Sequence, residues 1–313
     1  MALRYAFMGS PPIAVTILDR LLKDYGRPSL VVTQPARSAG RGKHLTPTAV
    51  EAFARSQNLE VIPSENVNAD ATVQAIRSTQ PDVILVAAFG QILKADILKL
   101  PRLTCLNVHA SLLPKYRGAA PVQRAIWNGD TTTGITIQKM APKLDTGDIL
   151  LQRSLIINPA ETSGELLDRL AILGGEAACA ALKQMESGKS QFAPQDESKA
   201  SDAPKIQKQD AMIRWKLPAQ QIQRQIRALQ PWPVAETLWD KQKLKILRAD
   251  LLGPLPGKKI AEIETDRATH LYIQCGQAAL ALTEVQLENR KRLPIQDFLK
   301  GYRGEFPQHL GDP

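Results

Sequence analysis

The chain has 313 residues, which at roughly 150 residues per domain indicates two domains and excludes a small disulfide-stapled protein. Its 40 Lys and Arg exceed its 31 Asp and Glu by nine, and 43% of its residues are hydrophobic, so neither disorder nor membrane embedding is expected. Pro11 and Pro12 interrupt the short apolar stretch at the N-terminus, which argues against a signal peptide. We therefore expect a soluble cytoplasmic protein, with a monomer as the default. The cysteines lie far apart, with neither a disulfide framework nor a thiolate metal site: Cys105, Cys179 and Cys275.

Short apolar runs alternate with helix-period segments in the first third of the chain. This alternation predicts an α/β fold with a Rossmann-like, doubly wound and mostly parallel sheet. The expected strands are Arg4–Met8, Leu30–Thr33, Glu60–Ile62, Asp82–Ala87 and Thr104–Val108. The expected helices, each with Pro, Ser, Thr or Asn signals at its start, are Ala14–Lys23, Thr48–Gln57 and Ala69–Thr79.

A locally cationic segment follows the second expected strand. No acidic residue occurs between Asp24 and Glu51, whereas four basic residues do: Arg27, Arg37, Arg41 and Lys43. Such a segment can bind a polyanion, or it can be an ordinary solvated loop.

Asn107 and His109 end the fifth expected strand. Residues i and i+2 of a strand face the same side, so both side chains would point into the space beyond the carboxyl end of the sheet, where open α/β sheets bind ligands. An amide and an imidazole can both donate hydrogen bonds to a carbonyl oxygen that becomes an oxyanion. The alternative is a polar strand end at which the histidine has its hydrogen bonds satisfied within the protein and has no catalytic role. The spacing alone leaves both interpretations open.

The pattern changes after residue 133, where strands are expected at Ile135–Ile137 and Ile149–Ile157 and a long helix at Ser163–Ser187. A turn between these strands, Leu144–Asp148, contains a glycine and two carboxylates. It could hold Asp145 over the same space, to orient the imidazole or take a proton from an attacking amine. A capped turn with no further role is the alternative.

Residues 189–211 are rich in charged residues, Ser and Pro, and they are the best candidate for a linker. We therefore expect domains at 1–188 and 212–313, joined by a linker at 189–211. The second domain begins with an expected helix at Ala219–Leu229 and continues as β-like runs, which predict a small β-barrel or sandwich: Lys243–Leu247, Ile260–Ile263, Leu271–Cys275 and Leu280–Val285.

Asn107, His109 and Asp145, together with the Ser111–Pro114 and Leu144–Asp148 motifs, resemble the folate-dependent formyltransferases. Within that superfamily the chain is most similar to the methionyl-tRNA formyltransferases. Further matching segments, in the expected order along nearly the whole chain, are Thr33–Lys43, Arg117–Asp130, Arg227–Pro233 and Phe298–Arg303.

The resemblance implies transfer of a formyl group from 10-formyltetrahydrofolate to the α-amino group of methionyl-initiator tRNA. It assigns oxyanion stabilisation to Asn107 and His109, and orientation of His109 and help in removing the amine proton to Asp145. It implies no metal and no tightly bound cofactor, since the folate is a co-substrate. The residues it assigns to folate binding are Ser111, Leu112, Leu113, Pro114, Gly90, Gln91, Ile92 and Leu93.

The resemblance also implies that the cationic loop Gln34–Pro47 enters the acceptor stem of tRNA, with Arg37, Arg41 and Lys43 as the expected contacts. The C-terminal domain would then be an OB-like second surface for tRNA.

Three other functions are weighed against this one. A formyltransferase acting on a nucleotide-linked amino sugar would not explain the basic, glycine-containing loop. A nicotinamide-dependent oxidoreductase would need GxGxxG after the first strand, where Gly9-Ser10-Pro11-Pro12 stands instead. A catalytically silent RNA-binding protein would not need the Asn107, His109 and Asp145 set.

Overall fold

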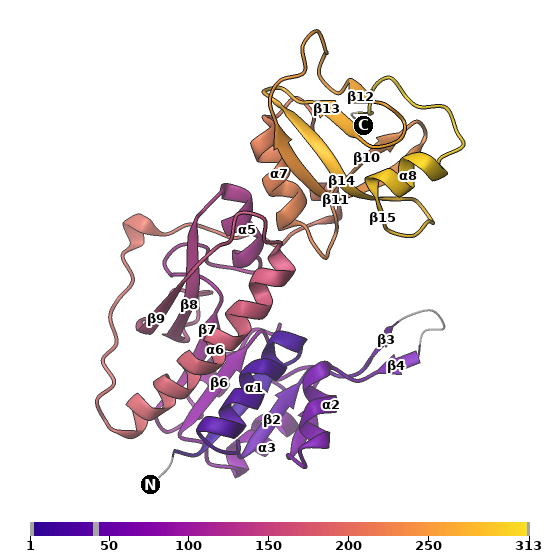
Figure 1. Cartoon of the computed structure of the whole chain (residues 1–313). Coiled ribbons are helices and arrows are strands. Elements are labelled where there is room, and N and C mark those ends of the chain that lie inside the picture. The colour runs from indigo at the N-terminus through magenta and orange to yellow at the C-terminus, as the bar shows by residue number, and fades with distance from the viewer. Residues whose placement is uncertain (1–2, 40–43, 312–313) are drawn as a thin grey trace. The chain divides into compact units, whose positions relative to one another are not determined.

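The computed structural model describes residues 3–39 and 44–311 (Figure 1). By its internal contacts the chain divides into two compact units. The first unit comprises Met1–Pro121, Thr132–Ile156 and Leu167–Ala203; the second comprises Val122–Thr131, Ile157–Leu166 and Pro204–Pro313.

The first unit is built on a seven-stranded sheet in the order β5-β2-β1-β6-β7-β8-β9. Its first five strands in this order are parallel to one another, β8 is antiparallel to β7, and β9 is antiparallel to β8, so the expected α/β class is confirmed. The strands are β1 (Tyr5–Gly9), β2 (Leu30–Thr33), β5 (Val61–Pro63), β6 (Val83–Ala87), β7 (Thr104–His109), β8 (Thr132–Lys139) and β9 (Ile149–Ile156).

Helices connect the parallel strands, and both faces of β1 and β6 are buried, as expected for the centre of a parallel sheet. The helix α1 begins with proline at its first position, where the missing N–H costs nothing, and Thr48 caps α2 by accepting a hydrogen bond from Glu51 N at 3.0 Å. The helices of the chain before the linker region are α1 (Pro12–Asp24), α2 (Ala49–Ser56), α3 (Asp70–Ser78), α4 (Ala95–Leu98), α5 (Pro121–Asn128) and α6 (Ser163–Glu186).

The residues that flank the centre of the cationic segment form two short strands. β3 (Arg37–Ala39) and β4 (His44–Thr46) pair as antiparallel strands, and in Figure 1 this pair extends away from the seven-stranded sheet. Arg37 is exposed on it. The other two expected tRNA contacts, Arg41 and Lys43, lie outside the described residues.

The second unit contains an antiparallel sheet in the order β10-β11-β14-β13-β12, with β15 paired to β14, which fits the expected small barrel. One expected strand, Ile260–Ile263, is wrong, because the carboxylate of Glu262 accepts a hydrogen bond from Lys259 N and closes a turn there. The elements are α7 (Ala219–Ala228), β10 (Glu236–Trp239), β11 (Gln242–Leu252), β12 (Ile263–Thr265), β13 (Leu271–Gln274), β14 (Ala279–Leu287), β15 (Leu293–Pro294) and α8 (Ile295–Gly301).

Part of the segment expected as a linker is fastened to the first unit. Ala193 exchanges two main-chain hydrogen bonds with Ile149 at the start of β9, and Ala203 N donates to Arg117 O. We call residues 193–203 the strap. The boundaries 1–188, 189–211 and 212–313 stay a prediction, but composition did not reveal that the strap makes these main-chain bonds.

Candidate active site

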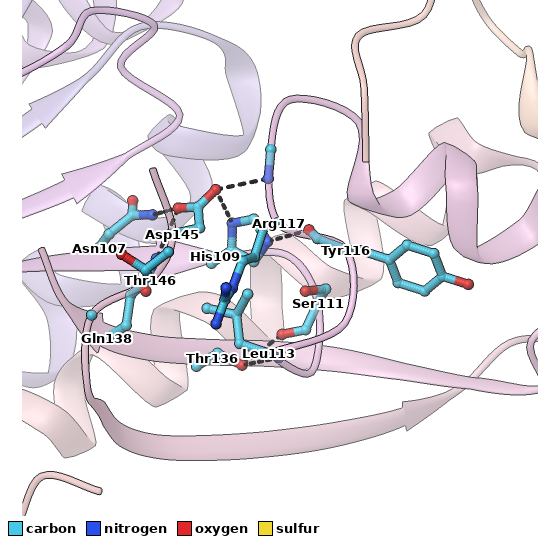
Figure 2. Close-up of polar contacts among 12 residues, drawn as sticks. Asn107, His109, Ser111, Leu113, Tyr116, Arg117, Thr136, Gln138, Asp145 and Thr146 are labelled. Carbon is cyan, nitrogen blue, oxygen red and sulfur yellow. Dashed lines mark hydrogen bonds and ion pairs between the residues drawn. The ribbon is translucent and has the colours of Figure 1, made fainter. Parts of the chain in front are cut away.

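The last residues of β7 carry two of the three side chains expected to do chemistry. Asn107 and His109 alternate with Val108, and β8 aligns Gln138 beside Asn107 and Thr136 beside His109. Figure 2 shows Asn107, His109 and Asp145 gathered in one polar cluster with Gln138. His109 is buried and Asn107 is half-buried. The sheet thus holds both side chains on strand backbone rather than on a loop.

Asp145 reaches this cluster from the turn between β8 and β9. Its side chain is only 6% exposed, and its φ of 54° lies in the left-handed region that side chains other than glycine rarely adopt. One carboxylate oxygen, Oδ1, accepts from Gln138 Nε2 at 2.8 Å and from Asn107 Nδ2 at 3.4 Å. The other, Oδ2, accepts from Gly118 N at 2.9 Å. Three donors therefore fix this carboxylate before any substrate binds.

The two ring nitrogens of His109 face different partners (Figure 2). Nε2 lies 2.9 Å from the carbonyl oxygen of Tyr116, and because a carbonyl can only accept, Nε2 carries a proton and donates it. Nδ1 lies 3.6 Å from Asp145 Oδ2, which is ion-pair distance but longer than a good hydrogen bond. Nδ1 is therefore the ring nitrogen that remains available for a further partner.

The expected folate residues 111–114 form a braced loop after β7. Thr136 Oγ1 donates to Ser111 O at 2.7 Å and accepts from Leu113 N at 3.0 Å, and Gln152 Nε2 donates to Leu113 O at 2.8 Å. Ser111 and Leu113 are buried, whereas Leu112 and Pro114 are partly exposed. The exposed parts of the loop can contact a ligand, and its buried parts set its shape.

The second expected folate segment, residues 90–93, follows β6. Gln91 is occupied by the main chain, because its Oε1 accepts from Val67 N and its Nε2 donates to Ser64 O, both at 2.8 Å. Gly90 has a φ of 82°, Ile92 is 79% exposed and Leu93 is buried. This leaves the main chain and the Ile92 side chain, rather than the Gln91 amide, as the groups that a ligand can meet.

Sequence reasoning missed several members of the polar cluster. Gln138 and Thr136 could have been found, since they are the polar residues that alternate with Ile135 and Ile137 in a strand whose interior is buried. Gln195, on the strap, donates from Nε2 to the carbonyl oxygens of Asp145 at 2.9 Å and Gly147 at 2.7 Å. Nothing local in the sequence links it to a turn almost fifty residues earlier.

Two wider searches of the described residues bear on function. In residues 3–39 and 44–311, no three His, Cys, Asp or Glu side chains are placed to share a metal ion. Nor does any helix of that same part of the chain combine the length and the apolar character needed to cross a membrane.

An α/β sheet that presents an amide and an imidazole at a strand end, beside a carboxylate from a neighbouring turn, is suited to acyl-transfer chemistry. Comparison with known proteins narrows this class. The family model for formyl transferase matches residues 3–182, and the model for the C-terminal domain of formyl transferase matches residues 205–303. Together these two matches define the chain as a formyl transferase.

Full-length relatives identify the family within that class. The methionyl-tRNA formyltransferase of Geobacter metallireducens is 41% identical over 305 residues, covering 97% of both chains. That of Moorella thermoacetica is 41% identical over 300 residues, covering 96% of both. The chain belongs to the methionyl-tRNA formyltransferase family, which confirms the resemblance found in the sequence.

Solved structures share the fold at much lower sequence identity. The N-formyltransferase of Helicobacter canadensis, solved with folinic acid and dTDP-3-aminofucose, has a TM-score of 0.66 and 18% identity, covering 93% of this chain and all of that one. HypX of Aquifex aeolicus, solved with tetrahydrofolic acid, has a TM-score of 0.64 and 17% identity, covering all of this chain and 51% of that one.

Proposed function

We propose that this protein transfers the formyl group of 10-formyltetrahydrofolate to the α-amino group of methionine esterified to initiator tRNA, with Asn107, His109 and Asp145 as its catalytic residues. The observation that carries the proposal is the cluster itself: two side chains at the end of β7 and one on the turn after β8, hydrogen-bonded or ion-paired to one another, in a chain about 40% identical to methionyl-tRNA formyltransferases over nearly its full length.

The reaction forms a bond between the amine nitrogen and the formyl carbon and breaks the bond from that carbon to N10 of the folate. The proton that leaves the amine is balanced by the proton that N10 gains. Between these events the formyl oxygen carries a negative charge, which hydrogen-bond donors in a fixed position stabilise more than they stabilise the substrate.

Asn107 and His109 are suited to that oxyanion. The amide nitrogen of Asn107 has two hydrogens, and Asp145 Oδ1 uses one of them. In His109, Nε2 donates to Tyr116 O, so Nδ1 is the nitrogen that the substrate would meet, and it donates when the ring carries both protons. Asp145 balances the charge of a protonated imidazole, orients the ring and takes the amine proton, directly or through water.

The folate would lie against the two loops at residues 111–114 and 90–93. Their buried anchors keep the loops in place, so exposed groups such as Ile92 and Leu112 can provide apolar surface for the pterin, with main-chain groups providing hydrogen bonds. The side-chain amide of Gln91 is not expected to bind the pterin, because both of its polar atoms are already hydrogen-bonded to the main chain.

The β3–β4 pair would bind the tRNA acceptor stem. The pair is separate from the seven-stranded sheet, and Arg37 is exposed on it. Two more basic residues of the same loop, Arg41 and Lys43, lie outside the described residues. Replacing Arg37 by alanine should raise KM for tRNA and leave KM for the folate unchanged. Arg27→Ala is the matched control, because Arg27 belongs to the same cationic segment but its guanidinium is bound to Gln57 O and Asn58 O.

The decisive experiment is formyl transfer from 10-formyltetrahydrofolate to methionyl-initiator tRNA, with a nucleotide-linked amino sugar as the parallel acceptor. Asn107→Ala and His109→Ala should each lower turnover about a hundredfold or more, as expected for groups that act on a developing oxyanion. Thr146→Ala is the control, because Thr146 is in the same turn as Asp145 and its hydroxyl donates to Lys143 O within the turn. Transfer to the sugar alone would overturn the tRNA assignment, and wild-type turnover in either variant would remove that residue from the mechanism.

A further inference from the structure

The strap is anchored by hydrogen bonds at both of its ends. At one end Ala193 is bonded to Ile149, and at the other Ser201 and Ala203 bond to Tyr116 and Arg117, which precede Gly118. A Cβ at Gly118 would lie 2.8 Å from Ala203 O, so the two segments are in close contact. The strap therefore runs from the start of β9 to the loop that supplies the Gly118 N–H to Asp145.

Gln195 lies between these anchors and uses both ends of its carboxamide. Its Nε2 donates to Asp145 O at 2.9 Å and Gly147 O at 2.7 Å, and lies 3.3 Å from Gln138 Oε1. Its Oε1 accepts from Arg117 Nη2 at 2.7 Å and Nε at 3.1 Å. Rotating the amide by half a turn would set oxygen against carbonyls and nitrogen against a guanidinium, so its orientation is fixed.

Arg117 is itself held in place from the strap. It is buried, and its Nη1 and Nη2 donate to the two carboxylate oxygens of Glu197 at 2.9 and 2.7 Å, a two-point contact of fixed geometry. The Arg117 guanidinium, through this hydrogen bond, holds the pKa of Glu197 below its ordinary value. The Gln195 amide oxygen is thus bound to Arg117, which Glu197 holds in place, and its amide nitrogen is bound to the Asp145 turn.

The Asp145 turn needs such support because its backbone is unfavourable. A left-handed residue other than glycine costs about 1 kcal/mol or more, and Asp145 has this conformation at φ 54°. Two residues later the turn passes so close to β8 that a Cβ at Gly147 would lie 1.7 Å from Lys139 O. The carbonyls of both Asp145 and Gly147 accept hydrogen bonds from Gln195, so this one side chain restrains the turn at both residues.

We propose that Gln195 is a positioning residue for formyl transfer. Through its hydrogen bonds to the backbone of the Asp145 turn, it sets the position of the Asp145 carboxylate relative to His109. The proposal rests on the function proposed above. Gln195 acts through Asp145 and not on the substrates, so its removal should lower kcat and leave KM for both substrates unchanged. A side chain that only stabilises the fold would have no such selectivity.

The test combines two variants of Gln195 with a variant of Asp145. Gln195→Ala removes both ends of the amide, and we expect kcat to fall about tenfold or more, with both KM values within about twofold of wild type. Asp196→Ala is the matched control, since its exposed side chain bonds to the strap residues Ser198 and Lys199. It leaves the Gln195 and Glu197 side chains and their bonds to Arg117 in place, so kcat should be unchanged.

A double-variant cycle separates positioning from general destabilisation. If Gln195 works through Asp145, adding Gln195→Ala to Asp145→Ala should lower kcat by less than about twofold further. An equal loss in both backgrounds would overturn the proposal, as would wild-type kcat in Gln195→Ala. If Asp145→Ala alone keeps wild-type kcat, the catalytic assignment fails instead, and the two failures are distinguished.

Gln195→Glu serves if Gln195→Ala does not fold. Glutamate keeps the size of the side chain and the acceptors for Arg117, but it sets an oxygen against the Asp145 and Gly147 carbonyls. It should lower kcat at least as much as alanine does. Wild-type kcat in this variant would refute the proposal, and failure of both variants to fold would show that Gln195 is a folding element and not a positioning residue.

Discussion

Replacing Asp145 by asparagine changes one atom and tests the whole polar cluster. In the structure three protein nitrogens donate hydrogen bonds to its carboxylate: Gln138 Nε2 and Asn107 Nδ2 to Oδ1, and Gly118 N to Oδ2. An asparagine must put its NH2 on one of these two sides. Whichever side it takes, a donor then faces a donor.

The loss can be estimated from these contacts. With the NH2 at the Oδ2 position, the 2.9 Å bond from Gly118 N is lost; at the Oδ1 position, the 2.8 Å bond from Gln138 is lost. A hydrogen bond to a charged group contributes about 1.5–3 kcal/mol, so the free energy of unfolding should fall by about 2 kcal/mol. Turnover should fall further, because the amide also removes the negative charge beside His109 Nδ1, and we expect a loss of about a hundredfold or more.

The assay is single-turnover formylation of methionyl-initiator tRNA, with urea unfolding of the same preparation. The expected result is a folded protein, destabilised by about 2 kcal/mol, whose rate of formyl transfer is about a hundredfold lower while Thr146→Ala matches wild type. A variant that retains more than about a tenth of wild-type turnover would refute the reasoning. It would show that formyl transfer needs neither the negative charge of Asp145 nor its full set of hydrogen bonds.

Three further outcomes follow from the packing. Gly147→Ala should lower the free energy of unfolding by about 3 kcal/mol or more, because its Cβ would lie 1.7 Å from Lys139 O, and an unchanged urea midpoint would show that the turn can relax. Burial raises the pKa of the Cys105 and Cys275 thiols to about 12, so iodoacetamide at pH 8 should label them only after denaturation; rapid labelling of the native protein would contradict this. The folded thiols hold their protons more tightly than unfolded ones do. The stability that the protonated thiols contribute is therefore fully present below about pH 9 and is lost as pH rises from about 9 to 12. The melting temperature should fall across that range.

The sequence allowed much of the sheet and all three catalytic candidates to be named, Asp145 from its turn motif and the other two from local spacing. Apolar runs separated by helix-period segments are sufficient to predict β1, β2, β6 and β7 to within one residue at each end. Asn107 and His109 stand two apart at the end of such a run, and a strand necessarily points both to one side.

The support around Asp145 could not be predicted in the same way. Gln195 belongs to a stretch whose Ser, Pro and charged residues are typical of a linker, and its contacts are with main-chain carbonyls, which leave no trace in composition. The β3–β4 pairing was missed for a related reason, since Arg37–Ala39 and His44–Thr46 pair through backbone groups that every residue has.

The three candidate catalytic residues differ in how their positions are maintained, and this explains where the extra contacts lie. Asn107 and His109 are on β7, which is paired on both sides, so the sheet itself keeps them in register. Asp145 is on a turn with a left-handed backbone, which no strand pairing holds in place. A carboxylate that must stay close to His109 through a change in charge needs bonds to the turn as well as to its own oxygens. The described contacts provide both, from Gly118, Gln138 and Asn107 to the oxygens and from Gln195 to the backbone, and this is why we propose a positioning role for the strap.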